Sequence, residues 1–134
     1  MSHKIEEENH AKSQAEAQLG SIVEMVDALE AAGDDDEKRG KVERAIHEDP
    51  LSVEVRTAWY VAGSEKEKPS KYRILLCWGG PAVQVIGDLS EHGEPETARI
   101  EYQDWGTPWT EYWIEDDDKR EKLLTYARQF YFGE

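Results

Sequence analysis

The sequence predicts an α+β fold in which helices at both ends of the chain flank an antiparallel sheet. Three observations indicate this. Apolar residues recur at spacings of three and four before position 50, and at every second position in much of the remaining chain. The order of the elements is the third observation, because strands that follow one another without intervening helices pair antiparallel. We expect an N-terminal helical hairpin, four paired strands with a candidate fifth, and a C-terminal helix packed on the sheet.

The first predicted helix covers residues 12–32, and the polar residues 1–10 before it are expected to fray. Its apolar side chains are spaced by four, three, four and three residues, which places them on one face. Gly20 lowers the stability of this helix by about 1 kcal/mol without ending it, and Gly33 ends it. The expected buried face consists of Ala15, Leu19, Ile22, Val26 and Leu29.

A second helix is predicted to begin at residues 34–36, because carboxylates suit the positive end of a helix dipole. Pro50 ends it, with Asp49 expected to leave the helical conformation because a proline follows. The chain then divides into an N-terminal helical region, residues 1–50, and residues 51–134 with the sheet and the last helix. At 134 residues we expect the two regions to form one compact unit.

The middle of the chain predicts four strands. In residues 51–61 apolar side chains alternate with polar ones, so one face is expected to be buried. Residues 72–78 are apolar on both faces, which predicts a central strand covered on two sides. A glycine turn at 79–80 precedes antiparallel strands at 82–88 and 97–102. The expected inward side chains are Leu51, Val53, Val55, Trp59 and Val61 in the first strand and Ala98, Ile100 and Tyr102 in the fourth.

Residues 105–113, with the sequence WGTPWTEYW, predict an ordered loop, and 111–114 form the candidate fifth strand. Carboxylates at 116–118 are expected to begin the last helix, and Gly133 to end it. The apolar face of this helix is expected to consist of Leu123, Leu124, Ala127, Phe130 and Tyr131.

Negative charge concentrates in residues 91–118, which hold ten acidic residues, one basic residue and three of the five tryptophans. With a net charge of -14, the protein is expected to repel nucleic acid and anionic membranes and to attract a basic protein surface. Strand carboxylates two residues apart lie about 6.5–7 Å apart, close to the phosphate spacing along one nucleic-acid strand. Glu94, Glu96 and Glu101 therefore predict a row that mimics nucleic acid. The expected contact residues are Glu91, Glu94, Glu96, Glu101, Asp104, Trp105, Trp109, Glu111, Asp116, Asp117 and Asp118.

Two alternatives stay open. The acids can serve solubility alone, or cap helices at 116–118, and the tryptophans can pack into the core as most tryptophans do. If the tryptophans are exposed instead, the Trp/Tyr loop is a general protein-interaction module. The apolar face of the 12–32 helix packs on the sheet or joins two copies in a homodimer.

Catalytic and metal motifs are absent from the sequence. Cys77 is the only cysteine, lies in an apolar strand and excludes an intrachain disulfide, which fits a reducing cytoplasm. The four histidines have no ligand spacing, and no segment has the pattern of a calcium loop. The N-terminus has no apolar core of a signal peptide, and no run is long enough to span a membrane. We therefore expect a cytoplasmic, non-enzymatic protein that uses neither a cofactor nor a metal.

Three runs carry a resemblance: RILLCWGGPAVQVIGDL, EYQDWGTPWTEY and LLTYARQFYFGE. They resemble a family of small proteins encoded by phages, prophages and plasmids, for which no active site is established. The resemblance covers about residues 48–134, and EYQDWGTPWT is its most specific motif. It implies an origin in a mobile element. Small acidic proteins of mobile elements often inhibit host defence, as anti-CRISPR and antirestriction proteins do, so the implied partner is a nuclease or a CRISPR effector complex.

Overall fold

In the described part of the chain, three helices and five antiparallel strands form the predicted α+β fold. The computed structural model describes residues 2–132, with side chains described from His10 onward. The elements in chain order are α1 (Ser2–Ala32), α2 (Asp36–Glu48), β1 (Ser52–Thr57), β2 (Pro69–Cys77), β3 (Ala82–Asp88), β4 (Arg99–Gln103), β5 (Thr110–Tyr112) and α3 (Asp117–Ala127).

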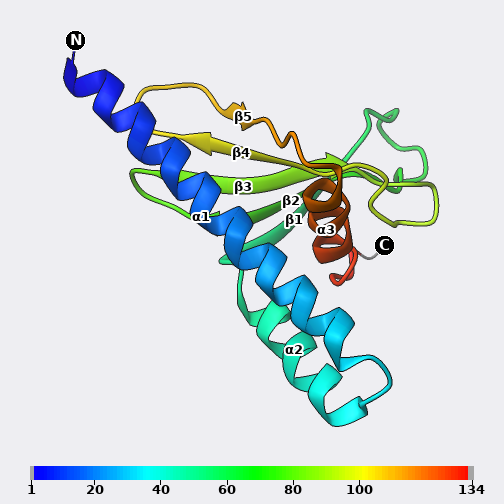
Figure 1. Ribbon diagram of the computed structural model, residues 1–134. Helices are drawn as coiled ribbons and strands as arrows, with labels where there is room; N and C mark the ends of the chain where they lie inside the picture. Colours follow the sequence, from blue (N-terminus) through cyan, green and yellow to red (C-terminus); the bar gives the residue numbers. More distant parts are fainter. Residues whose placement is uncertain (1, 133–134) are drawn as a thin grey trace.

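The sheet is a meander in which each strand pairs with its neighbours in sequence, in the order β1-β2-β3-β4-β5. Figure 1 shows α1 crossing one face of the sheet, with α3 beside it on the same face and α2 packed against α1. This face is called the covered face below, and the opposite one the open face. One core cluster joins side chains of all three helices to side chains of β2, β3 and β4, so the helical region and the sheet share their interior.

The five predicted face residues of α1 are all buried, which confirms the spacing argument. The helix begins at Ser2, however, and the expectation that residues 1–10 fray is wrong for the backbone. Ala11 is also fully buried, so the apolar stripe extends one turn further toward the N-terminus, and glutamates are good helix formers. Gly33 ends the helix with a positive φ of 51°.

Helix α2 begins as predicted, with Asp35 as its N-cap accepting a hydrogen bond from the backbone N–H of Lys38. It ends before Pro50, but Asp49 keeps a helical conformation (φ -65°, ψ -50°), contrary to expectation. Two hydrogen bonds offset the proline's preference: the Asp49 N–H donates to the carbonyl of Ile46, and the Asp49 carboxylate accepts one from the Tyr126 hydroxyl at 2.8 Å.

Strand β1 is an edge strand, and the prediction of a buried face for it is wrong. Leu51, Val53 and Val55 are exposed, and Trp59 and Val61 lie beyond the strand with their side chains in solvent. Alternation identified which residues share a side. The helices do not reach far enough across the sheet to cover that side at the edge.

Strand β2 is covered on one side only, where two were predicted. Tyr72, Ile74 and Leu76 are buried beneath the helices, whereas Arg73 on the open face is exposed. The central and most buried strand is β3. Gly87 in β3 lies so close to the β3–β4 connection that an added Cβ would come within 2.8 Å of the Tyr72 hydroxyl. This hydroxyl donates a hydrogen bond to the Thr97 carbonyl at 2.6 Å, which fixes the connection on the covered face.

The C-terminal half follows the prediction more closely. Ile100 is fully buried, and the candidate fifth strand exists as β5. Helix α3 ends at Ala127, so the predicted extension through Phe130 and Tyr131 is wrong, and Tyr131 is exposed. Gly133 lies outside the described residues. Tight turns follow α3 in place of the last predicted helical turn. The N–H of Phe130 donates a hydrogen bond to the carbonyl of Ala127 in one of them. No described helix is long and apolar enough to cross a membrane.

Candidate functional site

The predicted contact residues lie in separate places. Glu91, Glu94 and Glu96 are exposed on the β3–β4 connection, at one end of the sheet. Glu94 and Glu96 lie outside the strands, flanking a single bridge between Leu89 and Pro95. They therefore do not continue a strand row with Glu101, and the geometry predicted for a nucleic-acid mimic is not present in this segment.

Glu101 lies on the open face of β4, and its carboxylate contacts its own sheet. It accepts a hydrogen bond from the Gln84 side-chain amide at 2.7 Å and pairs with Arg99 at 3.0 Å. Only 13% of the Glu101 side chain is exposed. The carbonyl oxygen of the Gln84 amide is buried and has no hydrogen-bond partner among the described residues. Glu101 thus neutralises and orders neighbouring side chains, which leaves little of it for a partner.

Asp104 shapes the loop after β4 and is itself buried. Its carboxylate accepts a hydrogen bond from the Trp105 backbone N–H at 2.7 Å, and its backbone N–H donates to the Thr107 hydroxyl at 3.0 Å. The Thr107 hydroxyl in turn donates to the Asp104 carbonyl. These bonds satisfy a tight turn internally, and the turn projects the indole of Trp105 outward.

The tryptophans mostly face solvent, which decides between the two alternatives for them. Trp105 is 80% exposed and Trp113 is 64% exposed, while Trp109 is half-buried. Trp78, in the β2–β3 turn, is 68% exposed. The β2–β3 and β4–β5 turns lie at the same end of the meander, so Trp78 and Trp105 belong to one end of the sheet. Exposed aromatics gathered in this way are typical of interaction sites.

The side chain of Trp105 lies against the backbone of Gly80. A Cβ added at Gly80 would come within 2.7 Å of the indole Nε1 of Trp105 and even closer to Cδ1. The Cδ1–Nε1 edge of the indole therefore lies against the backbone of the β2–β3 turn, where only glycine leaves room. The predicted turn glycine thus has a second role, because it makes room for an exposed ring. We call this region, Trp78–Pro81 together with Trp105, the Trp105 platform.

A second feature is an open groove of about 570 Å³ between α1, β5 and the start of α3. It brings together two predicted contact residues, Glu111 and Asp116, with Trp113 on its wall. Burial, and then the nearby carboxylates of Glu16 and Glu115, raise the pKa of Tyr112 in this groove. The remaining lining residues are Lys12, Leu19, Tyr102, Tyr112, Ile114, Glu115 and Lys119.

The carboxylates at the start of α3 act mainly on the helix itself. Asp116 is the N-cap and accepts hydrogen bonds from the backbone N–H groups of Asp118 and Lys119. Asp117 pairs with Arg120 at 3.1 Å, and the Arg120 guanidinium lies 4.9 Å from the centre of the Trp113 ring. The helix-capping alternative therefore describes Asp116 well.

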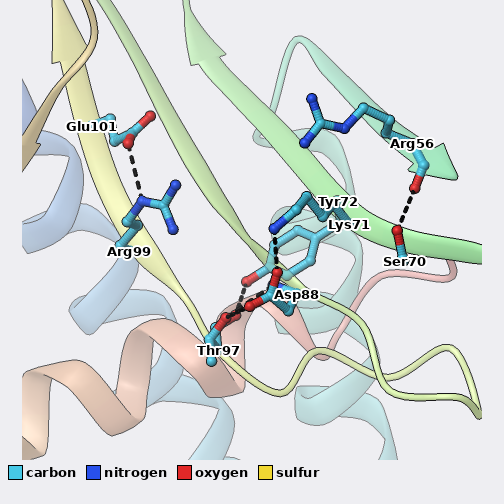
Figure 2. Close-up of polar contacts among 8 residues, drawn as sticks. All are labelled: Arg56, Ser70, Lys71, Tyr72, Asp88, Thr97, Arg99 and Glu101. Atoms are coloured by element: carbon cyan, nitrogen blue, oxygen red, sulfur yellow. Dashed lines mark hydrogen bonds and ion pairs between the residues drawn. The ribbon is translucent and has the colours of Figure 1, made fainter. Parts of the chain in front are cut away.

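The open face of the sheet carries a charged cluster that the sequence reasoning missed. Figure 2 shows Lys71 paired with Asp88, and Arg99 with Glu101, with nitrogen–oxygen distances of 2.6 and 3.0 Å. The hydrogen bond from Lys71 is the main cause that lowers the pKa of Asp88. Arg99 occupies an outward position of the predicted fourth strand, whereas Lys71 lies just before the predicted second strand, so the sequence held only part of the signal.

The single thiol of the chain is not activated for catalysis. Burial raises the pKa of the Cys77 thiol, so it stays protonated at neutral pH and is a poor nucleophile. Among the described residues, no three His, Cys, Asp or Glu side chains are placed to hold a metal ion. The arrangement offers surfaces for binding: an exposed aromatic platform and scattered carboxylates.

Comparisons with known proteins give no match: no family model, no curated protein and no solved structure resembles the chain. The relationship to proteins of mobile elements, suggested by the EYQDWGTPWT run, stays a prediction.

Proposed function

We propose that this protein is a non-enzymatic binding protein that inhibits a nucleic-acid-handling complex by occupying a basic surface of it. The observation that carries the proposal is the Trp105 platform. An 80% exposed indole, in contact with the backbone of Gly80, presents a large apolar area to a partner.

The charge of the protein supports a basic partner. At -14, its field repels nucleic acid itself and draws positively charged surfaces toward it. Channels that bind nucleic acid are lined with Lys and Arg, which makes nucleic-acid-handling proteins the best-matched class of partner. The resemblance of the EYQDWGTPWT run to proteins of mobile elements supports a host defence complex, such as a nuclease or a CRISPR effector.

The acids and the aromatics have different roles in this proposal. Carboxylates dispersed over the surface raise the rate of encounter and are screened by salt, since exposed charges interact over only about 8–10 Å at physiological ionic strength. The aromatic platform would determine how long the complex lasts, because large aromatic anchors dominate binding energies. Residue-by-residue mimicry of phosphates is not required.

Capture from a bacterial lysate tests the proposal. The tagged protein is expected to retain a complex that binds nucleic acid, and added duplex DNA or RNA is expected to displace that complex. Capture should weaken as salt rises from about 0.05 to 0.3 M, over which the screening length falls. Capture of no nucleic-acid-binding protein, or capture that nucleic acid does not compete with, would reject the proposed partner.

The exposure of the tryptophans, taken without the charge, favours a second candidate function: a general protein-interaction module. One of two variants separates the candidates, and the other tests the platform that they share. Trp105→Ala should abolish capture under both, whereas the triple variant Glu91→Lys, Glu94→Lys and Glu96→Lys should impair capture only if charge selects the partner. Trp59→Ala is the matched control, because Trp59 is fully exposed at the other end of the sheet.

A further inference from the structure

Strand β1 leaves one edge of the sheet unpaired. Within the described part of the chain it pairs only with β2, and the four residues from Val53 to Arg56 are all exposed. Val53 and Val55 point to the covered side, opposite Ile74 and Tyr72 of β2, without being covered themselves. An edge of this kind offers unpaired backbone N–H and C=O groups to another strand.

Arg56 lacks an acidic partner in its own sheet. The residue directly opposite it in β2 is Lys71, whose ammonium group already pairs with Asp88. No ion pair of Arg56 is found among the described residues, and the only dashed line to it in Figure 2 ends on its carbonyl oxygen. Like charges directly opposite one another destabilise a pair of strands, so a carboxylate supplied from outside would stabilise this edge.

We propose that β1 pairs antiparallel with β1 of a second copy of this chain, in a register centred on Val55. Twofold symmetry then places Val55 opposite Val55 of the second copy, and Glu54 opposite Arg56 of the second copy. Glu54 already pairs with Arg73 of its own chain at 2.9 Å through Oε1, so Arg56 of the second copy would share this carboxylate with Arg73. The Glu54–Arg56 contact forms twice, once on each side of the axis. Two five-stranded sheets become one continuous sheet, with the helices of both copies on the same face.

The backbone favours this centre. The Arg56 carbonyl accepts a hydrogen bond from the Ser70 hydroxyl at 3.3 Å, so this carbonyl faces β2. Backbone groups of successive strand residues point to opposite edges. The N–H and C=O of Val55 therefore face the free edge, where Val55 and its symmetry mate can exchange both hydrogen bonds.

Neighbouring registers are unfavourable. A symmetric register centred on Glu54 opposes two carboxylates, and one centred on Arg56 opposes two guanidinium groups. A shift by a single residue would bring side chains of the covered side against those of the open side. Charged side chains on edge strands usually prevent pairing, but in β1 they are arranged so that one register is complementary to itself.

Cysteine cross-linking tests the register in the full chain with Cys77→Ser. In the proposed dimer the two Val55 Cα atoms lie about 5.5 Å apart, within disulfide range. Val55→Cys should therefore form a disulfide-linked dimer under mild oxidation. The two Val53 positions lie about 13 Å apart in this register, so Val53→Cys is the matched control and should stay monomeric. Cross-linking of both variants, of neither, or of Val53→Cys alone would overturn the proposal.

Sedimentation equilibrium tests association without cross-linking. The pairing of single edge strands makes a small interface, so the dimer should be weak and is measured at up to about 1 mM protein. Arg56→Glu should reduce association at least about tenfold, since it opposes two carboxylates across the axis while facing Lys71 within its own chain. Val61→Lys adds a charge on an exposed apolar residue outside β1 and should have no effect. A monomer at every concentration, or equal loss in both variants, would contradict the proposal.

Discussion

The indole of Trp105 rests on the backbone of Gly80, so that a turn between β2 and β3 positions a side chain that belongs to the loop after β4. The two segments lie more than twenty residues apart in sequence and meet because the meander brings alternate turns to the same end. The lack of a Cβ at Gly80 leaves room for this ring, and the Asp104 carboxylate accepts a hydrogen bond from the backbone N–H of Trp105.

Gly80→Ala is therefore expected to displace the Trp105 ring and to destabilise the protein by only about 0.5–1 kcal/mol, because the exposed ring can move aside. Chemical denaturation and tryptophan emission would measure both effects. Gly20→Ala is the matched control: nothing lies within 4 Å of its added Cβ in α1, and it should stabilise the protein by about 1 kcal/mol. Unchanged stability and emission in Gly80→Ala would contradict the platform.

Gly87→Ala should be more damaging than Gly80→Ala. Its Cβ would collide with the backbone of Thr97 and with the Tyr72 hydroxyl that donates to the Thr97 carbonyl. Backbone cannot move aside as a side chain can, so we expect a loss above about 3 kcal/mol. Thermal unfolding measures it, and Gly40→Ala, whose Cβ meets nothing within 4 Å, should not lower the unfolding temperature.

Stability should fall steeply at alkaline pH. Burial is the largest cause that raises the pKa of Tyr72 and of Tyr126 above the ordinary value. The folded chain therefore holds two protons that the unfolded chain releases from about pH 10 upward. Below about pH 10 this contribution to the free energy of unfolding is fully present. Above about pH 10, each of the two tyrosines lowers the free energy of unfolding by about 1.4 kcal/mol per pH unit.

Denaturation at a series of pH values measures this slope. Tyr72→Phe and Tyr126→Phe should each lower it by about 1.4 kcal/mol per pH unit, since each removes one proton that the folded chain retains. Tyr131→Phe is the control, because Tyr131 is exposed and lies outside the core. A slope that survives both core substitutions would place the titrating groups elsewhere.

Acrylamide should quench most of the tryptophan fluorescence of the native protein. Trp59, Trp78, Trp105 and Trp113 are exposed, so the quenching constant should approach that of the unfolded chain. Trp105→Phe should lower the quenchable fraction, whereas replacing the half-buried Trp109 should change it less. Strong protection of the native emission would contradict the exposed platform.

Asp116→Ala should destabilise the protein by about 1 kcal/mol, because the variant loses the N-cap of α3. Asp117→Ala should cost less, since the pair that Asp117 forms with Arg120 is exposed. Urea denaturation distinguishes the two. Equal effects would show that general charge, rather than capping, accounts for the carboxylates at this helix start.

The periodic elements could be predicted from the sequence because spacing reports which side chains share a face. The stripe of α1 from Ala15 to Leu29 was found in full, and the N-cap residues Asp35 and Asp116 lie at helix starts as expected. Spacing does not report which faces other elements cover. For Val53 and Val55 that depends on how far the helices extend across the sheet, which is a property of the assembled layers.

The candidate site was harder to predict because it depends on contacts between distant segments. The acids looked equivalent in sequence, but Glu101 bonds to Gln84 and Asp104 to the Trp105 N–H, while Glu94 and Glu96 are exposed on a connection. Tryptophan is usually buried, so composition favoured a core position for Trp105. Its exposure follows from the tight turn at Asp104 and from Gly80, and no local pattern relates Gly80 to Trp105.

The meander also affects the order in which parts of the protein can fold during synthesis. Each strand pairs with the strand just before it, so hairpins can close soon after their second strand is synthesised, and such short-range pairing favours fast folding. Helix α1 is the exception: it is made first, yet its apolar stripe is covered by β3, β4 and α3, which are made later. Until those segments have been synthesised, the apolar stripe of α1 stays exposed in the nascent chain. It can then bind chaperones or aggregate.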